Sequence, residues 1–420
     1  MLSTVSPVST TLRARATGLI ALATTAMALP MVVVSMVGAV GPDLVTDLGV
    51  DRSSLGLLTT ATMTIAAVLS LVAGSYVDRI GPRRALLALF AVMVASFLLM
   101  ALSPGYGFLL FAVALCGPAQ ALANPATNKL VAAELADVRA TAIGVKQAGV
   151  QVAAVVSGVV LAPVSVLAGW RAAVWVLVPV AAFVGLLAWW VMPQTQTGPA
   201  TRAASGLAGS RATRSWQLGL APGMASLLIA QASVGVALAS VTAFLPLFAT
   251  ERVGLPATTG GLLLAVFAVA GVVSRIAWNR LADHRGRPDL VLAIVCLLAV
   301  VAPLLIAAGA WVPGAVWVGA FWMGATATAA NAVAMLLVVS DRRLGPIGAA
   351  SGMASLGFFG GFAIGPPTLG AIADSGLGYG GAWVVCAVVL AAGAAAATVT
   401  VVRLGGRPGP PETVGGPPST

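Results

Sequence analysis

The sequence predicts an all-α membrane protein with twelve transmembrane helices, arranged as two pseudo-symmetric six-helix bundles. Of its 420 residues, 59% are hydrophobic and only 8% are charged, and the mean hydropathy is +1.02. A soluble chain is typically about 25% charged, so this one has too few polar groups to cover a water-facing surface. Twelve apolar runs and an internal repeat of sequence landmarks complete the prediction.

Each expected span is an apolar run long enough to cross a hydrocarbon core of about 30 Å. The runs are separated by charged or Gly- and Pro-containing turns, such as the segment from Asp47 to Arg52. The expected spans are 17–39, 53–77, 85–103, 107–131, 141–166, 172–192, 218–249, 258–280, 289–310, 314–339, 348–372 and 381–403.

The two halves carry matching residues at a nearly constant offset, which indicates a duplicated unit. The matching pairs include Pro42 with Pro246, Asp78 with Asp283, Gly81 with Gly286, Asn124 with Asn331, Gly149 with Gly352, and Pro163 with Pro366. We therefore expect a six-helix bundle over 1–192, a cytoplasmic linker over 193–217, a second bundle over 218–403 and a disordered cytoplasmic tail over 404–420.

The arginines predict the orientation in the membrane. With both termini in the cytoplasm, the outer segments hold only Arg52, Arg171 and Arg252. The inner segments hold Arg13, Arg15, Arg79, Arg83, Arg84, Arg139, Arg202, Arg211, Arg214, Arg280, Arg285, Arg287, Arg342, Arg343, Arg403 and Arg407. The positive-inside rule then places the chain in the cell membrane with both termini inside. The net charge of +10 is thus explained by topology, and nucleic acid is not an expected partner.

One loop resembles the signature of a known family. The segment Gly74-Ser75-Tyr76-Val77-Asp78-Arg79-Ile80-Gly81-Pro82-Arg83-Arg84 is similar to the loop between the second and third spans of the major facilitator superfamily. The segment from Asn279 to Arg287 repeats the pattern in the second half. The resemblance covers about the whole chain and implies secondary transport by alternating access.

The resemblance also implies a cytoplasmic gate. It assigns Asp78, Arg79, Gly81 and Arg83 of the first loop, and Asp283, Arg285 and Gly286 of the second, to a cluster that locks the outward-open state. The residues alone indicate that the Asp78 carboxylate accepts hydrogen bonds from Arg79, from Arg83, or from amides at a nearby helix N-terminus. An ordinary topology-setting turn is the alternative.

Amide side chains predict a substrate pathway. Gln120, Asn124, Thr127 and Asn128 share one face of the fourth span, and Gln147 and Gln151 share a face of the fifth. The resemblance adds Gln231, Asn331 and Trp322 from the seventh and tenth spans. The alternative for the amides is hydrogen bonding between helices.

Three cations enter the spans, although ionisable residues inside a bilayer are costly. Lys146 is expected to contact substrate or the gate; the alternatives are snorkelling, or pairing with Glu134 or Asp137. Lys129 ends the amide stripe near the cytoplasm, and Arg275 is expected to join the second loop cluster. No acid reaches mid-membrane, so Asp43 is the nearest candidate for ion coupling; the alternative is an ordinary helix-end residue.

These features predict a monomeric transporter of a small anionic or polar solute, coupled to protons or another ion. The segment from Asn124 to Gln147 also resembles organic-anion and cyanate-type branches of the superfamily. The alternatives are a proton-driven exporter of a drug-like or amphipathic metabolite, and a non-transporting membrane sensor. Some drug and proton antiporters of the superfamily carry a G-x8-G-x3-G-P-x2-G-G pattern in the fifth span, and here Ala162, Val166 and Leu167 replace three of its glycines. We expect no enzymatic activity, cofactor or metal, since His284 is the only histidine and the three cysteines are isolated.

Overall fold

A computed structural model describes residues 7–49, 52–192, 221 and 223–405 of the chain. These residues form helices and turns without a strand, and twelve of the helical segments are long and apolar enough to cross a membrane. The twelve predicted spans and the all-α fold class are therefore confirmed. The predicted linker, 193–217, and the tail from residue 406 lie outside the described residues.

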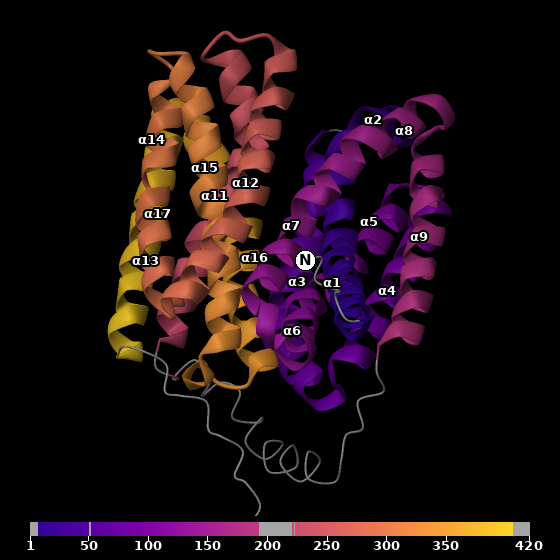
Figure 1. The fold of residues 1–420 in the computed structure, drawn as a ribbon. Helices are drawn as coiled ribbons and strands as arrows, with labels where there is room; N and C mark the ends of the chain where they lie inside the picture. The colour runs from indigo at the N-terminus through magenta and orange to yellow at the C-terminus, as the bar shows by residue number, and fades with distance from the viewer. Residues whose placement is uncertain (1–6, 50–51, 193–220, 222, 406–420) are drawn as a thin grey trace, which may run out of the picture.

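The first half contributes the helices drawn from indigo to magenta in Figure 1. They are α1 (Pro7–Ala39), α2 (Gly41–Leu48), α3 (Arg52–Ile80), α4 (Pro82–Ala101), α5 (Tyr106–Ala114), α6 (Cys116–Glu134), η1 (Ala136–Val138), α7 (Arg139–Val156), the π-helix η2 (Ser157–Leu161), α8 (Ala162–Ala168) and α9 (Trp170–Val191).

The second half forms a separate group of helices beside the first (Figure 1). They are α11 (Met224–Glu251), α12 (Ala257–Arg285), α13 (Pro288–Ala299), α14 (Val301–Ala308), α15 (Gly314–Ser340), η4 (Arg342–Leu344), α16 (Ile347–Ala373) and α17 (Gly378–Leu404).

The first and fifth spans of the first half depart from a continuous α-helix near one end; the first does so at its predicted limit, residue 39, and only the change inside the fifth was not predicted. The first span breaks at Val40, just before Gly41 and Pro42, and resumes as α2. The fifth changes to a π-helix over Ser157–Leu161, next to Pro163. Proline lacks the amide hydrogen that a continuous helix needs, and π-bulges commonly occur inside longer helices. The corresponding α11 and α16 of the second half run unbroken past Pro246 and Pro366.

Two helix pairs make the most extensive contacts between the halves, α3 on α16 and α7 on α12, and α6 also packs on α16. Glycines make the first contact close, because a Cβ atom added to Gly348 would lie 2.5 Å from the Gly74 carbonyl oxygen. Gly144 makes the second contact close in the same way, with a Cβ position 2.9 Å from the Arg275 carbonyl oxygen. Small residues allow helix backbones to approach within a membrane.

These close contacts lie toward one end of the molecule. We call this the closed end; it carries the turns at Gly81, Gly286 and Gly345. The opposite end carries the turns at Gly49, Gly169 and Gly254, and we call it the open end. The two groups of helices diverge toward the open end (Figure 1).

Candidate functional site

A cavity of about 1250 Å³ lies between the two halves. It reaches toward the open end at Thr46 and Gly56. Toward the closed end it is bounded by the α3–α16 and α7–α12 contacts. Helices α1, α3, α6 and α7 of the first half line it, together with α11, α12, α15 and α16 of the second. This is the arrangement expected of a central site that opens to one side at a time.

Five of the predicted pathway residues line this cavity: Gln120, Asn124, Gln147, Gln151 and Asn331. They come from α6, α7 and α15, and each has no more than 6% of its surface exposed. The sequence therefore identified one polar wall, because amides on a single helix face avoid lipid only by facing a cavity or another helix.

Asn124 connects this wall to the other half. Its Oδ1 accepts hydrogen bonds from Gln147 Nε2 at 3.1 Å and from Lys146 Nζ at 3.4 Å. Its Nδ2 donates to Ser355 Oγ of α16 at 3.1 Å. One turn further, Asn128 Nδ2 donates to Ser351 Oγ at 2.8 Å. Asn128 is not among the cavity-lining residues, so its contact joins the halves beneath the cavity.

Lys146 is fully buried, and its ammonium also donates to Thr127 Oγ1 at 3.0 Å. It takes part in none of the ion pairs among the described residues. The alternatives of snorkelling and of pairing with Glu134 are excluded in this conformation, because the side chain has no exposed surface and Glu134 pairs with Arg15. Lys146 is not a lining residue, so it lies behind the polar wall with neutral partners.

Arg275 corrects one sequence expectation. Instead of joining the second loop cluster, its side chain is 3% exposed and lines the cavity. Nε donates to the Thr328 carbonyl oxygen at 3.2 Å, whereas Nη1 is buried without a hydrogen-bond partner. The cause is its position, ten residues before the end of α12, which is too deep for the guanidinium to reach the closed end.

Two other predicted pathway residues lie elsewhere. Trp322 is half-buried, and its indole donates to the Leu298 carbonyl oxygen of α13 at 2.8 Å, on a side of α15 that does not line the cavity. Gln231 is fully buried in α11 without a partner for either side-chain polar atom, and it is not a lining residue. The expectation that these two side chains line the cavity is therefore wrong for this conformation.

At the closed end, Asp78 connects the two halves. Its carboxylate accepts hydrogen bonds from the amides of Gly348 at 3.1 Å and Ala349 at 2.9 Å, in the first turn of α16. Lys129 of α6 pairs with the same carboxylate at 3.1 Å. Helix N-termini favour negative charge, which explains why the Asp78 carboxylate binds the backbone amides of α16 and not Arg79 or Arg83. Arg83 instead donates to the Trp189 carbonyl oxygen and lies over that indole, and Arg79 is exposed.

The second copy of the loop makes a different contact. Asp283 pairs with Arg139 at the start of α7 at 3.0 Å, and Arg280 donates to Thr141 Oγ1 at 3.2 Å. Gly81 and Gly286 both adopt positive φ, at 84° and 60°, where the chain turns between helices. Arg285 is exposed. Both loops thus lie at contacts between the halves, as a gate requires.

Asp43, the predicted coupling residue, lies toward the open end. Its carboxylate accepts a hydrogen bond from Ser165 of α8. One turn away, Trp170 Nε1 and Arg171 Nη1 donate to Asp47 Oδ2 at 2.9 and 2.6 Å. These hydrogen bonds, first that of Trp170 and then that of Arg171, lower the pKa of the Asp47 carboxyl below its usual value. The cluster ties α2 to the segment after the π-helix.

The comparison with known families decides the identity. The family model described as Major Facilitator Superfamily matches residues 20–345. The chain belongs to the major facilitator superfamily. Members of this superfamily are transporters of small solutes and not enzymes.

Solved structures agree with the fold. The major facilitator superfamily transporter FucP in its outward conformation superposes with a TM-score of 0.67 at 15% identity, covering 91% of this chain and 98% of that one. A variant of the E. coli fucose:proton symporter FucP gives a TM-score of 0.66 at the same identity and coverage. At this identity the likeness shows the fold alone. Among curated protein sequences, none matches this chain.

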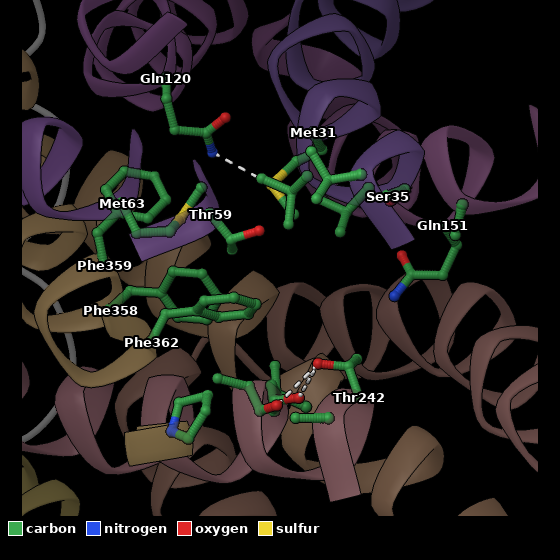
Figure 2. A pocket seen from close by; sticks show the side chains of 18 of the residues that line it. Met31, Ser35, Thr59, Met63, Gln120, Gln151, Thr242, Phe358, Phe359 and Phe362 are labelled. Carbon is green, nitrogen blue, oxygen red and sulfur yellow. Dashed lines mark hydrogen bonds between the residues drawn. The ribbon is translucent and has the colours of Figure 1, made fainter. Parts of the chain in front are cut away.

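Sequence reasoning missed the apolar wall of the cavity. Phe358, Phe359 and Phe362 of α16 and Phe267 of α12 line it, with Met27, Met31 and Met63 facing from the first half. Figure 2 shows the rings of Phe358 and Phe362 lying across the cavity from Gln120 and Gln151. In an apolar span these residues look like ordinary packing, and only the Phe358-Phe359 pair in a glycine-rich helix hinted at them.

Proposed function

We propose that this transporter moves a small organic anion across the membrane by alternating access. The observation that carries the proposal is Arg275, a buried guanidinium on the cavity wall whose Nη1 has no partner. An unpaired buried charge is costly, and an anion arriving in the cavity would remove that cost. The described lining residues include no Asp or Glu that could neutralise Arg275 or attract an organic cation.

Orientation and coupling extend this proposal. By the positive-inside rule the closed end, with its arginine-rich loops, faces the cytoplasm, so the described conformation is open to the outside; import is the direction that we propose. Proton coupling stays a prediction with Asp43 as its candidate, since the acids of the described spans lie at their ends. Each chain has its own pathway, so a monomer is sufficient for the proposed transport.

The second candidate function is export of an amphipathic metabolite with proton drive. The aromatic and methionine wall favours it, because drug-sized apolar groups bind on such surfaces. Arg275 distinguishes the two candidate functions, because an exporter of neutral or cationic compounds would gain nothing from a buried guanidinium on the cavity wall.

The test is uptake into proteoliposomes of three labelled carboxylates, acetate, lactate and mandelate, each beside its neutral amide. We expect uptake of at least one carboxylate above protein-free liposomes, no uptake of its amide, and loss of the signal in Arg275→Gln. Arg403→Gln is the control, since Arg403 is exposed at the end of α17. Equal transport of acid and amide would contradict the proposal.

A further inference from the structure

The cavity combines two kinds of surface that a small inorganic anion would not need. One side is aromatic: the ring centroids of Phe358 and Phe359 are 5.6 Å apart, and those of Phe358 and Phe362 are 6.0 Å apart. Phe358 and Phe362 are only partly buried in the described conformation and project toward the open space (Figure 2). A flat apolar group could stack on these rings and leave water.

Other residues of the cavity wall hold polar atoms of both kinds without partners. Arg275 Nη1 is an unpartnered donor, whereas Gln120 Oε1, Gln151 Oε1 and Asn331 Oδ1 are unpartnered acceptors, and all four residues line the cavity. A simple anion offers only acceptors, so it would satisfy the arginine and leave the carbonyl oxygens unsatisfied. A ligand that also donates a hydrogen bond would satisfy both, and each buried polar group left unpaired weakens binding.

Gln151, Thr328 and Arg275 lie close together between α7, α12 and α15. A Cβ atom built on Gly271 would lie 3.5 Å from Gln151 Nε2 and 3.1 Å from Thr328 Oγ1. Arg275 is one helical turn from Gly271, and its Nε already bonds to the Thr328 carbonyl oxygen. Gln151 of one half and Arg275 of the other therefore lie close enough to hold one small head group together.

We propose that the substrate is an aromatic monocarboxylate carrying a hydroxyl or N–H donor beside the carboxylate. The carboxylate binds Arg275, the donor bonds to the carbonyl oxygen of Gln151 or Asn331, and the ring stacks on Phe358 and Phe362. One charge suffices, because Lys146, the other buried cation, already contacts Asn124 and Thr127 and is not a lining residue. This inference rests on the proposed anion transport, and it adds that the substrate has an aromatic ring and a hydrogen-bond donor beside the carboxylate.

The test is binding of four compounds to the purified full-length protein, measured by isothermal titration. Mandelate has carboxylate, hydroxyl and ring; phenylacetate lacks the hydroxyl, lactate lacks the ring, and mandelamide lacks the charge. We expect mandelate to bind at least about tenfold more tightly than each of the others, as one lost hydrogen bond or one exposed ring implies.

Variants assign each difference to its residue. In the double variant Phe358→Ala and Phe362→Ala, the preference of mandelate over lactate should fall to less than about threefold while lactate affinity is kept. In Gln151→Leu, the preference for mandelate over phenylacetate should fall in the same way. The preference for mandelate over lactate should remain, which would show that the variant keeps its fold. Phe321→Ala is the matched control, because Phe321 lies on α15 with half of its surface exposed.

The outcomes separate this inference from the proposed function. Lactate binding as tightly as mandelate would overturn the aromatic substrate while leaving anion transport intact. Mandelamide binding as tightly as mandelate would overturn both. Failure of all four compounds to bind a protein that melts in one sharp transition would overturn the aromatic hydroxy acid, and the uptake of acetate would then decide the fate of anion transport.

Discussion

Two of the contacts between the halves, α3 on α16 and α7 on α12, have the same geometry but different chemistry. Both are close glycine contacts that end in an aspartate of a duplicated loop. The α7–α12 contact also carries Gln151 and Arg275, whereas the repeat offset of 205 places Ser70 where Arg275 would be. Ser70 hydrogen-bonds within its own helix. Duplication thus supplied two equivalent contacts, and we infer that only one became the substrate-sensing contact.

The largest expected effect comes from removing the charge of the α7–α12 contact. Arg275→Gln should lower anion uptake by about a hundredfold, because truncating one partner of a buried charged pair weakens binding by several kcal/mol. Arg275→Lys should keep part of the activity. Initial uptake rates in proteoliposomes measure this, and Ser70→Ala, at the equivalent place on α3, should change uptake less than twofold.

A smaller loss is expected for Lys146, which lies behind the polar wall. Lys146→Met should lower uptake by about tenfold, since the ammonium orients Asn124 and Thr127 and adds positive potential near the cavity. The melting temperature should not fall, because a buried cation without a carboxylate costs stability. Unchanged uptake would show that Lys146 serves packing alone.

The closed ends of the two contacts should differ in strength. Asp78 accepts two backbone amides and pairs with Lys129, whereas Asp283 pairs with one arginine that is 43% exposed. Exposed ion pairs contribute little, so Asp283→Asn should open the gate less than Asp78→Asn. Labelling of Ser351→Cys by N-ethylmaleimide reports the opening, and we expect an increase of about tenfold for Asp78→Asn. Equal labelling in both variants would contradict the difference.

The twelve spans, the repeat and the amide wall could be predicted, because hydropathy and the face of a single helix are local properties. The aromatic wall and the environment of Arg275 could not, because they depend on the way two helices of different halves meet. The sequence around Phe358, or around Arg275, is the same whether that side chain faces lipid, a neighbouring helix or a cavity. The π-helix that begins at Ser157 was also missed, since the apolar run continues through it.

The smallest expected effect lies at the open end, away from both contacts. The pKa of Asp47 is lowered by Trp170 and Arg171, so its contribution to stability is present above the unfolded pKa of about 3.9 and is lost as pH falls through the lower folded pKa. Asp47→Asn should lower the melting temperature by about 1 °C at pH 7 because the carboxylate is exposed. The two melting curves should converge once the pH is below the lowered pKa of Asp47. If the melting temperatures of the two proteins still differed at that pH, the effect of Asp47→Asn would come from packing and not from charge.

The central claim is that the anion binds on the α7–α12 contact. A crystal structure with 4-bromomandelate, phased on the anomalous signal of bromine, tests it directly. The account predicts the carboxylate within about 3 Å of Arg275 Nη1 and the bromine beside Phe358 or Phe362. A bromine position against the α3–α16 contact, or a carboxylate bound to a cation outside the cavity, would contradict it.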